Sequence, residues 1–356
     1  MIRCVLADDS RVFRAILRAI LSRAPDVEVV GEAADGADAV RKVVALRPDV
    51  VTMDVRMPGK DGLYAIEEIM EHAPTPIVVV SAEAGPERQD LSFRALQLGA
   101  VEVLPKPRSD AGAFEHDVEA IRTAVRAVAG LRLAPRRPRP SPPGGPPGAA
   151  GQPARTSGTG LHALAAPRVV GIVASTGGPA ALARILGALG PAFPLPIAVV
   201  QHIARGFEGG LVHWLAGETA LSVTLASDGQ ELAPGTVYLG ADGRHLTVRG
   251  DRIRLDDGAP VRGFRPSGTR LLSSLAAENG AGAAGVILSG MGDDGAAGLA
   301  EVHEAGGFTA AQGESSSVIF GMPKAAIDRG AATVTLELDE IAPALARLAR
   351  GAARRA

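Results

Sequence analysis

Short apolar runs alternate with amphipathic stretches through the first 129 or so residues of the chain. In the stretch after the first run, Val12, Ile16 and Ile20 fall on one face of a helix. The strands predicted from the apolar runs are Ile2–Ala7, Val27–Gly31, Val50–Met53, Ile77–Val80 and Val101–Leu104. Strands that alternate with helices in this way form βα units around a parallel sheet. Five such units predict a flavodoxin-like, doubly wound α/β domain.

The same alternation returns at Val169 and continues through most of the remaining chain. The elements predicted there are strands at Val169–Val173, Ile197–Gln201, Ala284–Leu288, Gly307–Ala311 and Ala332–Leu336, and helices at Phe207–Leu215 and Thr269–Asn279. Residues 222–256 differ, because short strand-like runs are separated by turn sequences such as Ala233-Pro234-Gly235. We therefore expect a second doubly wound parallel α/β domain that carries a β-meander as an insertion.

A stretch rich in proline and glycine separates the two patterns. Eight prolines lie between residues 131 and 160, and Arg136, Arg137 and Arg139 fall near its start. Such a sequence cannot bury enough apolar surface to order itself, so it is typical of a linker. The predicted boundaries are 1–125 for the first domain, 126–165 for the linker and 166–356 for the second domain.

The composition narrows the choice of partner and compartment. The chain has 356 residues and a formal net charge of -2, so no basic excess indicates a nucleic-acid partner. Cys4 is the one cysteine, so a disulfide within one chain is excluded. It lies in an apolar run and is expected in the core. The N-terminus lacks a signal-peptide pattern, and no apolar run is long enough to span a bilayer. We therefore expect a cytoplasmic protein without membrane insertion.

Polar residues stand at the ends of strands predicted for the first domain, where ligands bind in open α/β sheets. They are Asp8, Asp9, Asp54, Ser81 and Lys106. Three carboxylates at one edge repel one another, and a Mg²⁺ ion bound by carboxylates and phosphate oxygens would relieve the repulsion. Lys106 supplies a positive charge for phosphate, and Asp54 can become an aspartyl phosphate. The alternative is that these acids are ordinary turn and helix-cap residues. That interpretation would explain any one of them alone, but not all of them at the ends of strands in one sheet.

These residues give the first 120 or so positions a resemblance to response-regulator receiver domains. The matching motifs are Asp8-Asp9-Ser10, Met53-Asp54-Val55-Arg56-Met57-Pro58 with Asp61-Gly62, Val80-Ser81-Ala82 and Pro105-Lys106-Pro107. The resemblance implies that Asp54 is the phosphoacceptor, Ser81 the switch hydroxyl and Lys106 the phosphate partner. It also implies a metal site formed by Asp8, Asp9, Asp54 and the backbone carbonyl of Arg56.

The second domain begins with a strand, a tight turn and a helix start. Ser175 follows the strand, Gly177 and Gly178 permit the turn, and Pro179 suits the first helical position. The turn leaves backbone N–H groups beside a hydroxyl, and such groups stabilise an oxyanion or bind a phosphate. Three interpretations compete for the serine: a helix N-cap, part of a dinucleotide-binding turn, and a nucleophile. Val173 interrupts the dinucleotide fingerprint and argues against the second interpretation.

A base and an acid for Ser175 stand at the ends of two further predicted strands. His202 follows one strand, and Asp294 lies in a Gly-rich turn after another. Their side chains can meet at one edge of a parallel sheet as nucleophile, base and orienting acid. Asp293 competes with Asp294, since one would hold the histidine while the other capped the next helix. The order serine, histidine, aspartate and the lack of a G-x-S-x-G motif exclude the α/β-hydrolase family.

With these residues the second domain resembles the catalytic domain of the CheB family of chemotaxis protein-glutamate methylesterases/glutaminases. The matching stretches are Ala174-Ser175-Thr176-Gly177-Gly178, Gln201-His202, Arg265-Pro266-Ser267, Ser289-Gly290-Met291-Gly292-Asp293-Asp294-Gly295 and Val318-Ile319-Phe320-Gly321-Met322-Pro323. The resemblance implies Ser175 as nucleophile, His202 as base and Asp294 as orienting acid. It makes the backbone N–H groups of Thr176 and Met291 the oxyanion candidates. The departures from the usual family pattern, which leave substrate preference and rate open, are Val173, Phe264 and Asp293.

The resemblance implies a serine-type carboxylic ester hydrolase regulated by phosphorylation. It would hydrolyse γ-glutamyl methyl esters on methyl-accepting chemotaxis receptors, release methanol, and deamidate particular receptor glutamines. The implied phosphodonor is a CheA-type histidine kinase, with Mg²⁺ at the receiver site and no cofactor for the esterase reaction. Two rival functions are a domain that only binds a partner and an output domain that binds a nucleotide. The set of serine, histidine and aspartate argues against a domain that only binds a partner, and the missing dinucleotide fingerprint argues against a nucleotide-binding domain. The sequence leaves open whether the enzyme serves a chemosensory array that does not control motility.

Overall fold

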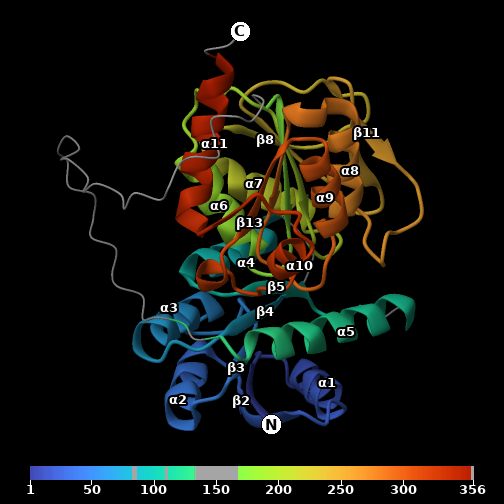
Figure 1. The fold of residues 1–356 in the computed structure, drawn as a ribbon. Coiled ribbons are helices and arrows are strands. Elements are labelled where there is room, and N and C mark those ends of the chain that lie inside the picture. Colours follow the sequence, from blue (N-terminus) through green and yellow to red (C-terminus); the bar gives the residue numbers. More distant parts are fainter. Residues whose placement is uncertain (82–85, 109–110, 132, 134–166, 354–356) are drawn as a thin grey trace, which may run out of the picture.

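The computed structural model describes residues 1–81, 86–108, 111–131, 133 and 167–353. Within these residues, two α/β domains lie against each other, and each is built on a parallel sheet flanked by helices (Figure 1). None of the described helices combines the length and the apolar character that a transmembrane span requires.

The described part of the first domain has five parallel strands in the order β2-β1-β3-β4-β5. The strands are β1 (Ile2–Ala7), β2 (Val27–Ala33), β3 (Val50–Met53), β4 (Ile77–Ser81) and β5 (Glu102–Pro105). The helices are α1 (Arg11–Ser22), α2 (Gly36–Leu46), α3 (Gly62–His72), α4 (Pro86–Leu98) and α5 (Ala111–Val128). This order is the flavodoxin-like one, so the predicted fold class is confirmed for this domain.

Side-chain caps and fully buried strands explain why the helices and strands of the first domain could be predicted from its sequence. Ser10, Asp35 and Asp61 each precede a helix and accept a hydrogen bond from a backbone N–H of its first turn. All four residues of β3 are buried, as expected of a parallel strand covered on both faces. Cys4 is fully buried in β1, which confirms its predicted place in the core.

In the described part of the second domain, seven parallel strands pair in the order β14-β13-β12-β6-β7-β9-β8. The strands are β6 (Val169–Ala174), β7 (Ile197–Gln201), β8 (Ser222–Leu225), β9 (Thr236–Leu239), β12 (Ala283–Ile287), β13 (Phe308–Gln312) and β14 (Val334–Leu336). The helices are α6 (Gly178–Ala188), α7 (Glu208–Glu218), α8 (Gly268–Asn279), α9 (Ala296–Glu304), α10 (Met322–Asp328) and α11 (Leu338–Ala353). Because β12, β6 and β7 are neighbours, the loops that follow them open at one edge of the sheet.

The predicted β-meander is wrong. β8 and β9 join the main sheet as parallel strands. Among the described strands of this region, only β10 (His245–Arg249) and β11 (Arg252–Asp256) form an antiparallel pair, beside an isolated antiparallel bridge between Glu231 and Arg252. The burial pattern gives the reason. Val237–Leu239 is buried without interruption, as in a strand covered on both faces, whereas buried Ile253 alternates with exposed neighbours. Alternation of that kind belongs to an antiparallel ribbon with one face in water.

The predicted linker falls mostly outside the part of the chain that the structure describes. α5 continues to Val128, beyond the first-domain boundary predicted at residue 125. Residues 134–166 lie outside the described residues, and the second domain is described from Pro167 onward.

The two domains meet where α4 packs against α6 and α7 (Figure 1). Phe93 of α4 stacks on Trp214 of α7, with 5.6 Å between ring centroids and 14° between ring planes. Phe93 also meets Phe207 edge-on, with 6.5 Å between centroids. Gln97 and Glu218 form a short hydrogen bond between the same two helices. Aromatic pairs of this geometry contribute about 0.5–1.5 kcal/mol beyond the area they bury, so this cluster favours the docked arrangement.

Candidate functional site

Neighbouring strands bring the residues predicted for the second site to one edge of the sheet. Ser175 follows β6, His202 follows β7, and Asp294 lies in the loop between β12 and α9. The His202 Nε2 and Asp294 Oδ2 atoms are 2.9 Å apart. The Nδ1 atom of His202 is buried and has no hydrogen-bond partner among the described residues. One imidazole nitrogen is therefore held by a carboxylate, and the other is available to a hydroxyl.

Asp294 is a buried carboxylate surrounded by hydrogen-bond donors. Its Oδ1 accepts from the Ser267 hydroxyl at 2.7 Å and the Thr269 N–H at 3.1 Å, and its Oδ2 accepts from the Gly268 N–H at 2.6 Å. These donors belong to the start of α8, where the helix dipole favours negative charge. Burial by itself would raise the pKa of Asp294, but His202, then Ser267 and Thr269, outweigh it and hold the pKa well below its ordinary value. The carboxylate stays ionised and is able to orient the imidazole.

Asp293 neither holds His202 nor caps the next helix, the two roles considered for Asp293 and Asp294. It forms a short ion pair with Arg262. The expected aspartate cap on α9 is wrong, because the N-cap position is Gly295, which has a φ of 91° and no side chain to accept a hydrogen bond. Asp294 instead faces the start of α8.

Gln201 is a site residue to which the sequence assigned no role. The side chain is buried at the end of β7, and its Nε2 donates to the Ser175 carbonyl at 2.9 Å and the His202 carbonyl at 2.7 Å. Gly178 lies so close to this side chain that any Cβ at position 178 would collide with it. The amide therefore fixes the backbones of Ser175 and His202 relative to each other. A polar residue at the end of a fully buried strand was the available signal.

Two of the loops at this edge of the sheet carry backbone N–H groups without an acceptor among the described residues. The N–H groups of Thr176 and Met291 donate to no acceptor within the described part of the chain. Ser289 joins the two loops that carry them, since the Ser175 N–H donates to the Ser289 carbonyl at 3.0 Å and the Ser289 hydroxyl donates to the Thr176 carbonyl at 2.8 Å. Gly290 passes so close that a Cβ there would collide with the Ser175 side chain. The turn therefore resembles a preorganised oxyanion site.

The first domain reaches this turn through Glu102 of β5. The Thr176 side chain lies close enough to the Glu102 carboxyl to lower its pKa. Burial raises the pKa of Glu102 to about 7, against the opposing effect of Thr176 and of the bond from the Val103 N–H. The first domain thus contacts the residue beside Ser175. Sequence reasoning missed Glu102 because the contact depends on how two separate domains dock.

The acids predicted for the first domain also converge. One oxygen from each of Asp8, Asp9 and Asp54 lies within 4.8 Å of the others. The Lys106 Nζ atom is 2.6 Å from Asp8 Oδ2 and 2.6 Å from Asp54 Oδ2. Burial raises the pKa of Asp8, the Lys106 ammonium opposes this shift, and the charge of Asp54 adds to it. Three crowded carboxylates of this kind fit a hard divalent cation, which takes oxygen ligands.

Ser81 and Arg56 complete the set of residues predicted around the acids. Ser81 is buried at the end of β4, and its carbonyl accepts from the Lys106 N–H at 2.8 Å. The Arg56 N–H donates to Asp54 Oδ1 at 3.2 Å, which places the Arg56 backbone beside that carboxylate. The structure therefore gathers the receiver-type residues at the carboxyl ends of β1, β3, β4 and β5.

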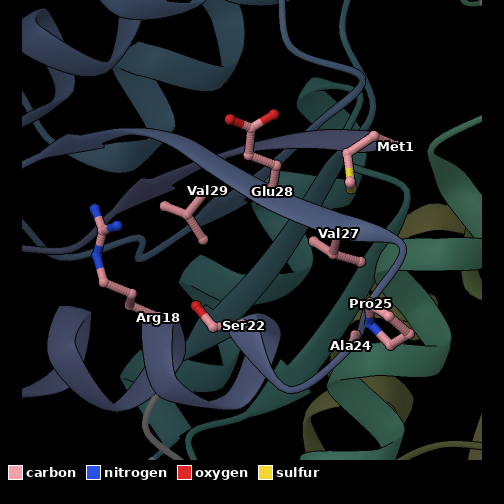
Figure 2. A pocket seen from close by; sticks show the side chains of 8 residues that line it. All are labelled: Met1, Arg18, Ser22, Ala24, Pro25, Val27, Glu28 and Val29. Carbon is pink, nitrogen blue, oxygen red and sulfur yellow. The ribbon is translucent and has the colours of Figure 1, made fainter.

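The hollow shown in Figure 2 lies at the opposite end of the first sheet. It is lined by Met1, Arg18, Ser22, Ala24, Pro25, Val27, Glu28 and Val29. Met1 and Val27 stand at the amino ends of β1 and β2, whereas Asp8 and Asp54 follow the carboxyl ends of β1 and β3. The hollow contains none of the predicted site residues, and we assign it no function.

Comparisons with known proteins agree with both halves of the chain. The family model described as CheB methylesterase matches residues 170–345, and the response regulator receiver domain model matches residues 4–115. The protein-glutamate methylesterase/protein-glutamine glutaminase 3 of Anaeromyxobacter dehalogenans (strain 2CP-C) is 47% identical over 349 residues, which cover 97% of this chain and 98% of that one. The homologue numbered 4 in Myxococcus xanthus (strain DK1622) is 43% identical and covers 98% of both chains. The crystal structure of the Thermotoga maritima CheB methylesterase catalytic domain is 35% identical, with a TM-score of 0.50, and covers 52% of this chain and 100% of that one.

Proposed function

The chain belongs to the CheB methylesterase family, and from this premise we propose that Ser175 is its nucleophile, His202 its general base and Asp294 the acid that orients the base. The protein is a phosphorylation-regulated hydrolase that demethylates glutamate γ-methyl esters on chemotaxis receptors and deamidates receptor glutamines. The observation that carries the residue assignment is the 2.9 Å contact between His202 and Asp294, which leaves Nδ1 of His202 without a partner among the described residues.

In the proposed reaction, Ser175 Oγ attacks the γ-carbonyl carbon while its proton passes to the available nitrogen of His202. Asp294 stabilises the imidazolium that forms, and the N–H groups of Thr176 and Met291 stabilise the negative charge on the carbonyl oxygen. The carbon–methoxy bond then breaks, and methanol leaves with the proton from His202. A water activated by His202 hydrolyses the glutamyl ester on Ser175. A glutamine substrate follows the same route with ammonia as leaving group, and we propose no cofactor for either hydrolysis.

Methanol release from methylated receptor membranes tests this function. We expect the purified protein to release methanol, and mass spectrometry of the receptor to show glutamate in place of its methyl ester or glutamine. A protein that binds these membranes without releasing methanol would instead support the binding-only function.

For the first domain, we propose that Asp54 accepts a phosphoryl group from a CheA-type histidine kinase. Lys106 contacts both Asp54 and Asp8, so its charge is placed to pair with phosphate oxygens. Asp8, Asp9, Asp54 and the Arg56 carbonyl would hold Mg²⁺. The ion would supply positive charge to the transferring phosphoryl group. Ser81 is the proposed switch hydroxyl. The receptors and the kinase are the proposed partners, and the cytoplasm is the proposed compartment.

We expect a small phosphodonor with Mg²⁺ to add one phosphoryl group to Asp54, because the other acids and Lys106 surround this carboxylate. Mass spectrometry should find the adduct on the peptide that contains Asp54 and lose it in Asp54→Ala. Asp61→Ala is the matched control, since Asp61 is a nearby exposed acid that caps α3. An adduct that survives Asp54→Ala would show that another acid is the phosphoacceptor.

We expect Glu102 to make docking of the two domains depend on pH. Its pKa is about 7 in the docked structure, against an ordinary value of 4.5. The docked state therefore favours the protonated carboxyl. Its contribution to docking is fully present below about pH 4.5 and is lost as the pH rises through about 7.

We expect the fluorescence of Trp214, the one tryptophan in the chain, to report this loss. Trp214 stacks on Phe93 across the interface, so separation of the domains changes its surroundings. Raising the pH from about 5.5 to about 8 should shift the emission toward that of an exposed indole. In Glu102→Gln, whose amide stays neutral, the shift should be smaller. Equal responses of the two proteins would show that Glu102 does not set the pH dependence of docking.

A further inference from the structure

The ring of Phe264 lies flat on the imidazole of His202. The ring centroids are 4.1 Å apart and the ring planes differ by 12°. The edge of the same imidazole is held by Asp294, and the His202 side chain is only 10% exposed. An edge contact alone leaves the imidazole free to tilt about the hydrogen bond, and a flat partner on its face removes that freedom.

A tight turn presents Phe264 to the base. Val261 and Phe264 exchange two backbone hydrogen bonds of 3.0 and 2.9 Å. Between them, Arg262 and Gly263 have φ values of 50° and 88°. Positive φ at both central residues defines a type I′ turn, in which glycine or asparagine is the usual choice. An arginine in this conformation is retained only where its surroundings fix it, and such positions cluster near functional sites.

Contacts on both sides hold the turn in place. The Arg262 side chain pairs with Asp293, the neighbour of Asp294, so the turn is tied to the loop that carries the acid. Buried His245 contacts the chain both before and after this turn. Its Nε2 lies 3.0 Å from the Ala259 carbonyl, and its Nδ1 accepts from the Ser267 N–H at 3.2 Å. Two of the residues that depart from the usual family pattern, Phe264 and Asp293, therefore belong to one connected arrangement around the base.

We propose that Phe264 is a positioning residue for catalysis, whose flat ring holds the His202 imidazole so that one nitrogen faces Asp294 and the other serves Ser175. This inference rests on the proposed function, because it takes His202 as the base. The face of the phenyl ring also attracts the imidazolium that forms when His202 takes the serine proton. A residue that merely fills space at position 264 would give neither effect.

The test compares Phe264→Leu and Phe264→Tyr in the full chain, since leucine keeps an apolar side chain and tyrosine keeps a flat ring. Methanol release from methylated receptors should show kcat reduced roughly ten-fold in Phe264→Leu with KM unchanged, because small misplacements of a catalytic group slow the chemical step. Phe264→Tyr should stay within about two-fold of the parent. Phe193→Leu is the matched control, since Phe193 is a buried residue of the same domain core. It should lower the melting temperature and leave kcat unchanged.

A spectroscopic measurement reads the stack without relying on activity. In protein labelled at histidine, the ring protons of His202 should shift downfield in Phe264→Leu, because the ring current of the phenyl group is lost. They should stay near their parental positions in Phe264→Tyr and Phe193→Leu, and His202→Gln identifies the signal. Unchanged kcat in Phe264→Leu, or an equal loss of kcat in Phe264→Tyr, would overturn the proposal. Activity that survives Ser175→Ala and His202→Ala would overturn the proposed function instead, and the ring-proton shift would still report the stack.

Discussion

Replacement of Ser175 by alanine is expected to abolish methanol release while the protein stays folded. The change removes one hydroxyl from a turn whose backbone is held by Ser289 and Gln201, so the structural cost is small. The chemical cost is large because the nucleophile is lost. Removal of a triad member slows comparable enzymes by roughly 10⁴- to 10⁶-fold. Methanol release, together with the melting temperature of the variant, measures both effects.

The other two residues of the proposed triad should follow the same pattern with different residual rates. His202→Ala should be as severe as Ser175→Ala, because the hydroxyl is a poor nucleophile without its base. Asp294→Asn should be severe but leave more activity, since Ser175 and His202 remain in place. The double variant Ser175→Ala/His202→Ala should be no slower than either single variant, because residues that act as a unit lose their function together.

Ser289 offers a stringent control for Ser175. It is also a serine in a glycine-containing turn that follows a strand, but its hydroxyl donates to the Thr176 carbonyl and accepts from the Ile319 N–H at 2.9 Å. Those bonds give it a structural role. Ser289→Ala should therefore lower stability and retain measurable methanol release. Parental activity in Ser175→Ala combined with complete loss in Ser289→Ala would move the nucleophile to Ser289 and sink the triad assignment.

The positions of these residues were predictable because strand ends are predictable. Buried β-branched runs fix where β6 and β7 stop, and parallel pairing then carries the residues that follow to one edge of the sheet. The same logic gathers Asp8, Asp54 and Lys106 in the first domain. Local sequence therefore predicts which residues gather at each candidate site, since the arrangement depends on which residue follows each strand.

Contacts between distant surfaces were not predictable in this way. Phe264 and Glu102 contact partners far away in the sequence, as Gln201 does at Ser175, and the residues that surround them in the sequence do not identify those partners. Glu102 reads as an ordinary edge residue of β5 until the two domains dock. The error over β8 and β9 has a related cause, because a short apolar run does not reveal whether its neighbour is parallel or antiparallel.

We propose that the unphosphorylated receiver inhibits the esterase, and the interface between the domains supports this proposal. Glu102 contacts Thr176, the residue beside the proposed nucleophile and a candidate oxyanion donor. Phe93 anchors α4 on Trp214 of α7. α4 begins at Pro86, five residues after Ser81, the proposed switch residue. A phosphoryl group on Asp54 that draws Ser81 inward would therefore move the element that carries Phe93 and loosen the interface.

Deleting residues 1–160 is accordingly expected to raise basal methanol release by roughly ten- to a hundred-fold, the gain for a docked form that makes up about 90–99% of the population. The crystallised catalytic domain of the Thermotoga maritima relative, which this chain covers completely, shows that such a domain folds on its own. Phe93→Ala in the full chain should raise basal activity as well, since it removes the buried ring of the interface. Asp54→Ala should stay slow whatever phosphodonor is added.

The decisive assay measures methanol release from methylated receptors by the full chain, Asp54→Ala, Phe93→Ala and the truncated domain, each with and without phosphodonor. Phosphodonor should accelerate methanol release by the full chain but not by Asp54→Ala. The truncated domain should be fast, and phosphodonor should not change its rate. A complete change in the ratio of undocked to docked protein from 1:99 to 99:1 requires phosphorylation to favour the undocked state by about 5.5 kcal/mol. A partial change in this ratio requires a smaller free-energy difference. If the truncated domain is no faster than the unphosphorylated full chain, the contact between Glu102 and Thr176 does not inhibit the enzyme. Phosphorylation would then have to act by another route, such as an increased affinity for the receptor.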